Sequence, residues 1–172
     1  MSPSMFKHTT RSQLLSALKM TTACIRRCPD EHWDSTVGTL PFWMVAYHTL
    51  CWTDLYLARS NSAWVPDIGV PGAALPLHPK GRKELSNPRP SRRFEREELL
   101  RYTRICAAKI PKALDAETAT SLAGPSGFSW ITGPRAEVYL YNLRHLAHHG
   151  GQLSASLRRV GVRTPWVREA RG

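Results

Sequence analysis

The clearest pattern of hydrophobic and polar positions lies near the end of the chain, between residues 135 and 161. Apolar side chains recur there at steps of three and four residues, which is the spacing of one face of an α-helix. They are Tyr139, Leu143, Leu146, Leu153, Leu157 and Val160. Arg158 and Arg159 close the pattern and Gly161 follows them, and last-turn cations before a glycine are typical of a helix C-terminus. The pattern therefore predicts a helix over residues 135–160.

The same spacing predicts three further helices earlier in the chain, over residues 8–28, 41–59 and 94–114. Pro29 is expected to stop the first of them, and Pro41 suits the first turn of the second. Pro111 is expected to kink or end the third. Four such helices predict an all-α protein folded as a four-helix bundle, with a single domain over residues 1–172.

The predicted helices are joined by one short loop and two longer ones. The short loop is EHWDSTVGTLP, residues 31–41, where Trp33 is expected to plug the end of the bundle. Residues 60–93 form a long crossover rich in proline, and such a segment can be either a binding loop or a solvated wrap over the bundle. His78 lies between prolines in this crossover and is expected to be exposed. Residues 115–134 form the second long loop.

Length and composition are those of one globular domain. The chain has 172 residues, of which 42% are hydrophobic and six are tryptophan, enough for a substantial core. No apolar run approaches the roughly 20 residues of a membrane span, and residues 1–20 lack the hydrophobic centre of a secretory signal. A soluble cytoplasmic protein is therefore expected. Its four cysteines form no Cys-x-x-Cys pair and are expected to be reduced thiols: Cys24, Cys28, Cys51 and Cys106.

A strongly basic charge raises nucleic acid as a partner. Lysine and arginine exceed aspartate and glutamate by 24 − 13 = +11. Much of the excess lies in residues 80–96 and in the tail 158–171, and no recognition-helix or RNA-binding signature accompanies it. The distribution favours a soluble basic surface over a nucleic-acid site. It leaves the second interpretation open, and a steep fall of affinity with salt would support it.

Histidines supply the candidate chemistry. His145 and His149 are four residues apart on the helix 135–160, so they lie about 40° apart on the border of its apolar face, whereas His148 turns about 60° further towards the polar side. Two histidines at this spacing can both reach one metal ion. His48 lies near the centre of the apolar face of the helix 41–59. A single histidine there is more often a hydrogen-bonded core residue, but together with the pair it can complete a metal site.

Two segments carry a resemblance to a known family. They are PFWMVAYHTLCWTDLYL and YNLRHLAHHGGQLSASLRRVGV, and they resemble the DinB/YfiT-like superfamily of bacterial four-helix bundles. The resemblance covers nearly the whole chain and implies that His48, His145 and His149 bind a divalent metal ion. The chain departs from the family pattern at Gly150, where many members have an arginine in an HRGQ run. The departure removes no ligand, but it leaves no arginine beside the site.

Four further residues near the histidines are candidates for supporting roles. Asp54 could accept a hydrogen bond from a ligand imidazole, although an ordinary polar role is an alternative. Gln152 could orient a bound water or substrate, or bond to a neighbouring helix. Tyr141 could cap the pocket or belong to the core. Cys51 could supplement a ligand, against the commoner role of a small buried side chain.

Three imidazoles suit several metals, among which zinc and nickel are expected first. Three protein ligands leave a coordination position open, which is typical of catalytic rather than structural sites. Some members of the family are thiol-dependent transferases, so the resemblance implies an unidentified small-molecule substrate and a low-molecular-weight thiol, or a metal-activated water. The sequence identifies no catalytic residue. A metal-binding stress-response bundle without turnover is the alternative, and a homodimer is expected because bundles often pair through an exposed helix face.

Overall fold

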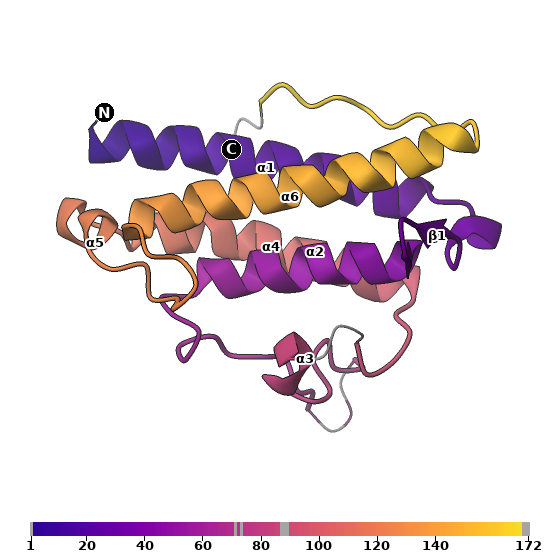
Figure 1. Ribbon diagram of the computed structural model, residues 1–172, viewed down its shortest axis with the longest axis horizontal. Helices are drawn as coiled ribbons and strands as arrows, with labels where there is room; N and C mark the ends of the chain where they lie inside the picture. The colour runs from indigo at the N-terminus through magenta and orange to yellow at the C-terminus, as the bar shows by residue number, and fades with distance from the viewer. Residues whose placement is uncertain (1, 71, 73, 87–89, 170–172) are drawn as a thin grey trace.

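Four long helices dominate the computed structural model, which describes residues 2–70, 72, 74–86 and 90–169. They lie side by side as a bundle (Figure 1). The helices are α1 (Pro3–Arg27), α2 (Phe42–Leu57), α4 (Arg96–Asp115) and α6 (Arg135–Arg159). The predicted all-α bundle is therefore confirmed, and the last helix begins at the predicted residue and ends one residue earlier than predicted.

Each long helix packs on two others, so that α1 and α2 each contact both α4 and α6. A fully buried leucine from every long helix lies in the shared core. These four are Leu14, Leu50, Leu99 and Leu146. Because α2 and α6 are direct neighbours, side chains on their facing sides can meet although they are far apart in the sequence.

The start of the first helix lies five residues before the predicted one, and the other ends of the long helices lie within two residues of the prediction. The first helix begins at Pro3 rather than at residue 8, because the Ser2 side chain caps it by accepting a hydrogen bond from the backbone N–H of Met5 at 3.2 Å. Pro111 does not end α4, which continues to Asp115. Proline removes one backbone donor, but Leu114 beyond it is fully buried, and this packing outweighs the lost hydrogen bond.

The connections contain short elements that the sequence did not predict. The first loop holds a 3₁₀ turn, η1 (Asp30–His32), and a small antiparallel hairpin of β1 (Thr36–Val37) and β2 (Leu40–Pro41). Short helices α3 (Lys83–Ser86) and α5 (Ala119–Ala123) lie in the two long connections. Trp33 is buried at the end of the bundle as predicted, and its Nε1 donates to the carbonyl of Phe94 at 3.0 Å.

The crossover is anchored in the bundle through His78, and the prediction that this histidine is exposed was wrong. Its side chain is only 1% exposed. Nδ1 accepts a hydrogen bond from the backbone N–H of Asp67 at 2.9 Å, and Nε2 lies 2.7 Å from the hydroxyl of Tyr102 on α4. That hydroxyl donates to Asp54 of α2 at 3.3 Å, and Trp64 of the crossover donates to the same carboxylate at 3.0 Å. These buried bonds join the crossover to two helices.

After α6 the chain turns back and runs over α1 and α6 (Figure 1). Arg27 donates to the carbonyl of Arg163 at 2.7 Å, and the hydroxyls of Ser154 and Thr164 lie 2.8 Å apart. A cavity of about 590 Å³ lies between the two helices and this tail. Trp166 is 78% exposed, so its side chain does not pin the tail to the bundle.

All four cysteines are free and buried. Among the residues that the structure describes, none of the helices combines the length and the apolar character needed to cross a membrane.

Candidate metal centre

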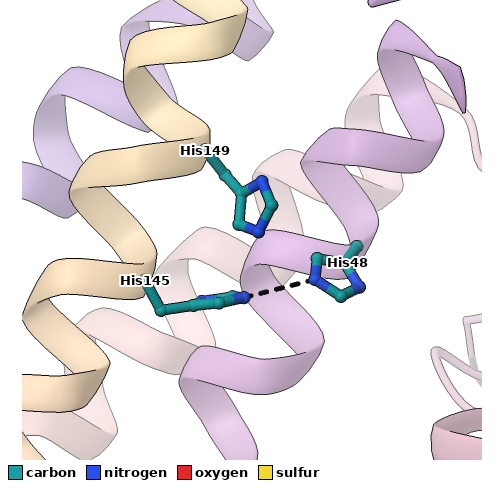
Figure 2. Close-up of side chains that lie close together, drawn as sticks. All are labelled: His48, His145 and His149. Carbon is teal, nitrogen blue, oxygen red and sulfur yellow. Dashed lines mark hydrogen bonds between the residues drawn. The ribbon is translucent and has the colours of Figure 1, made fainter. Parts of the chain in front are cut away.

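His48, His145 and His149 meet between α2 and α6. Figure 2 shows the His48 ring projecting from α2 towards the rings of His145 and His149, which lie one above the other on α6. The ring centroids are 5.2 Å apart for His48 and His145, 4.8 Å for His48 and His149, and 4.6 Å for His145 and His149. One nitrogen from each ring lies within 4.8 Å of the other two. These residues therefore form a group that could hold a metal ion.

The separation of the donor atoms fits a small divalent ion. Nε2 of His48 and Nε2 of His145 lie 3.2 Å apart. Two nitrogens bound at 2.0–2.1 Å to a tetrahedral ion are about 3.3–3.4 Å apart, so these two rings already stand near the spacing of two ligands. Without an ion, one of the two nitrogens donates a hydrogen to the other.

Burial keeps the imidazoles in the neutral form that binds metals. Desolvation, together with the nearby His149, lowers the pKa of His48 from 6.5 to about 4. Desolvation and the neighbouring histidines lower the pKa of His145 to about 3. Desolvation also lowers the pKa of His149. At neutral pH a metal ion would therefore displace no proton from the first two rings, because they carry no positive charge to begin with.

Gln152 orients the ring of one of the three histidines. Its Oε1 lies 2.8 Å from Nδ1 of His149, one helical turn earlier on α6. An amide oxygen can only accept, so Nδ1 of His149 donates and its Nε2 carries the free lone pair. Among the described residues Nδ1 of His145 has no hydrogen-bond partner. The His145 ring is instead held by packing, with its edge against Tyr56 at a centroid distance of 6.2 Å.

Asp54 lies on a different face of α2 from His48. It accepts hydrogen bonds from Trp64 and Tyr102, and its second oxygen lies 2.6 Å from Nζ of Lys109. These hydrogen bonds serve the crossover, so the structure gives Asp54 a role different from the predicted support of a ligand imidazole. Cys51 is buried, and desolvation, followed by the charge of Asp54, raises its pKa to about 12. Among the described residues, Cys51 does not belong to the group of possible metal ligands.

Tyr141 and His148 lie next to the group without belonging to it. The Tyr141 ring packs edge-on against Tyr56 at 5.2 Å and under the guanidinium of Arg144 at 4.9 Å. His148 is exposed, with its ring 4.9 Å from that of His149.

Sequence reasoning assigned no role in the site to the aromatic side chains that border the histidines. Trp52 lies with its ring 6.0 Å from that of His48, and Trp130 lies 6.0 Å from Trp52. Trp52 could have been found from its four-residue step after His48, because that step keeps two side chains on one helix face. Trp130 gives no such signal, since it comes from a loop.

Four packed helices with three inward histidines on two of them define a helical bundle with a candidate metal site. The chain belongs to the DinB superfamily, whose family model matches residues 13–153. The matched residues include all three histidines and Gln152. A search among curated proteins found no match. The family resemblance seen in the sequence is thus confirmed.

Proposed function

We propose that this protein binds one divalent metal ion, zinc or nickel, through Nε2 of His48, His145 and His149. The observation that carries the proposal is the convergence of three neutral imidazoles from two packed helices, with donor atoms within 4.8 Å of one another. Gln152 supports it by leaving Nε2 of His149 free to bind. The helices α2 and α6 need no rearrangement to bind the ion, because Nε2 of His48 and Nε2 of His145 already lie at the separation of two metal ligands.

We further propose that the site serves a transferase reaction with a low-molecular-weight thiol. A divalent ion held by three imidazoles lowers the pKa of a thiol or a water in its open position and so provides a nucleophile at neutral pH. In the part of the chain that the structure describes, no Asp, Glu or Cys joins the three histidines in a group of possible ligands. A thiol, with an ordinary pKa near 8.5, needs less help to ionise than water does, so it suits a site without a carboxylate base.

The residues of the chain have three tasks in this proposal. His48, His145 and His149 hold the ion without adding negative charge, which leaves the site positive and attractive to a thiolate. Gln152 keeps the His149 ring in one tautomer. Trp52 borders the site with apolar surface and limits its contact with water.

Metal content tests the first proposal. The untagged protein, purified without chelator and reconstituted separately with zinc and nickel, should hold about one ion per chain. His145→Ala should lose it. His148→Ala is the matched control, because it removes an exposed imidazole from the same turn of α6 that is not part of the group. Absence of metal from the wild type after reconstitution with either ion would refute the site.

Turnover tests the second proposal. Metal-loaded wild type should transfer a thiol such as cysteine or a related small thiol to an electrophilic acceptor such as 1-chloro-2,4-dinitrobenzene, and His145→Ala should not. If the wild type holds metal and shows no thiol-dependent turnover with a panel of acceptors, the protein is a non-catalytic metal-binding bundle.

A further inference from the structure

Aromatic side chains follow the three histidines along the facing sides of α2 and α6. On α2 the face that carries His48 goes on to Trp52 and then Tyr56, at steps of four residues. On α6 the face that carries His149 and His145 goes back to Tyr141 by the same step. A four-residue step turns the helix by only about 40°, so on each helix these rings follow the histidines along nearly the same face.

The rings make an unbroken series of contacts away from the candidate metal centre. Trp52 lies 6.0 Å from His48 on one side and 5.6 Å from Tyr56 on the other, measured between ring centroids. Tyr56 of α2 in turn lies 5.2 Å from Tyr141 of α6. Tyr56 is buried, whereas Trp52 and Tyr141 are only partly buried and so offer ring surface to a ligand.

Trp130 ends the series and is fixed in place by its loop. Its ring meets Trp52 at 6.0 Å with an interplanar angle of 78°, and its Nε1 donates to the hydroxyl of Tyr56 at 3.2 Å. Gly127 brings the loop against the end of α2, with φ of +84° and a position where a Cβ would stand 2.2 Å from the carbonyl oxygen of Arg59. Trp130 is nevertheless 45% exposed. An indole held by a hydrogen bond and a close backbone contact, yet left half open, is suited to ligand contact.

We propose that Trp52, Trp130 and Tyr141 form an aromatic shelf that binds an aromatic group on the ligand of the metal centre. The inference rests on the proposed metal site and adds to it the substrate class: a small anion whose metal-binding group carries an aromatic ring. The Trp52 ring lies 6.0 Å from the His48 ring, measured between centroids, so it adjoins a ligand anchored at the three histidines and can contact an aromatic group on it. Arg144, whose guanidinium lies 4.9 Å from the Tyr141 ring, adds a cation beside the shelf.

Two hydroxamates test the shelf on zinc-loaded protein. Acetohydroxamate and benzohydroxamate bind zinc through the same group and differ in carrying a methyl or a phenyl group. Isothermal titration calorimetry gives the ratio of their affinities. That ratio should favour benzohydroxamate in the wild type and fall about two- to tenfold in Trp130→Leu, the range that an aromatic pair contributes. Trp130→Phe should keep most of the preference.

Controls separate the shelf from the metal site and from general effects of losing a tryptophan. Trp166→Leu removes an indole that is 78% exposed on the C-terminal tail, and it should keep the wild-type ratio. Tyr141→Leu provides a second shelf variant, on α6, and should lower the ratio as Trp130→Leu does. Zinc content is measured for every variant.

An unchanged ratio in Trp130→Leu and Tyr141→Leu, with zinc fully bound, would overturn the shelf and leave the metal site intact. Failure of the wild type to bind zinc would instead overturn the metal site, and the shelf with it.

Discussion

The metal-free protein should lose stability as the pH falls from 7.5 to 5.5, because its buried histidines resist protonation in the folded state, three of them with a pKa of about 4 or below. Burial lowers the pKa of His48 and of His78 to about 4, and burial together with the other histidines lowers the pKa of His145 to about 3. In the unfolded chain the same groups have the ordinary pKa of about 6.5. Below that value the unfolded chain binds more protons than the folded protein does, so acid favours unfolding.

The size of the effect depends little on the exact pKa in the folded state. At pH 5.5 an unfolded histidine is about nine-tenths protonated and the folded one hardly at all, which costs about 1.4 kcal/mol per group. Three groups together cost about 4 kcal/mol relative to pH 7.5, a large share of the roughly 5–15 kcal/mol of a typical domain. The stability is fully present above about pH 7.5 and is lost progressively towards pH 4.

Urea denaturation in the presence of a chelator, followed by far-ultraviolet circular dichroism at pH 7.5, 6.5 and 5.5, measures this loss. The pH window separates the histidines from other groups. Hydrogen bonds and the charge of Arg92 lower the pKa of Glu98, so this glutamate titrates only in stronger acid. His145→Leu should reduce the pH-dependent loss by about a third, because one of the three groups is gone. The exposed His148→Leu should leave it unchanged.

A loss of less than about 1 kcal/mol between pH 7.5 and 5.5 would refute the reasoning, since even one buried neutral histidine costs more. The same is true if His145→Leu keeps the full wild-type dependence.

Two further predictions concern the hydrogen bonds around the site and the crossover. Gln152→Leu should weaken zinc binding about 10- to 100-fold in a competition titration with a chromophoric chelator, because His149 loses the acceptor that fixes its tautomer; an unchanged affinity would show that the bond is not needed. Tyr102→Phe should lower the free energy of unfolding by about 1–3 kcal/mol in urea denaturation, because the buried Nε2 of His78 is left without a partner. Wild-type stability would contradict the anchoring role of that hydroxyl.

Periodicity in the sequence was sufficient to predict the part of the site that depends on one helix. The apolar spacing of α6 defined its face, so the pairing of His145 with His149 followed from a four-residue step. The contact of Gln152 with His149 is also local, at three residues. The same periodicity argues against Asp54 as a partner of His48, because a step of six residues turns the helix to a position about 120° away. That turn could have excluded it as a partner of the histidines.

The burial of His78 could not be predicted in this way. The crossover has no helical periodicity, and the histidine is held by Tyr102, a residue 24 positions later on another element. The continuation of α4 beyond Pro111 likewise depends on packing, since Leu114 is buried by neighbouring helices and no local signal reports it. Tertiary contacts of this kind override local preference.

The buried anchoring of the crossover also determines how a small molecule can reach the histidines. A gate formed by residues 60–93 would have to break the bonds from His78 to Tyr102 and from Trp64 to Asp54 each time it opened, and each broken bond would leave a desolvated polar atom. These bonds therefore hold the crossover in place against the side of α2 that carries Asp54. A ligand of the proposed metal centre would therefore pass the rings of Trp52, Trp130 and Tyr141, and changes in Trp130 should alter the rates of its entry and exit.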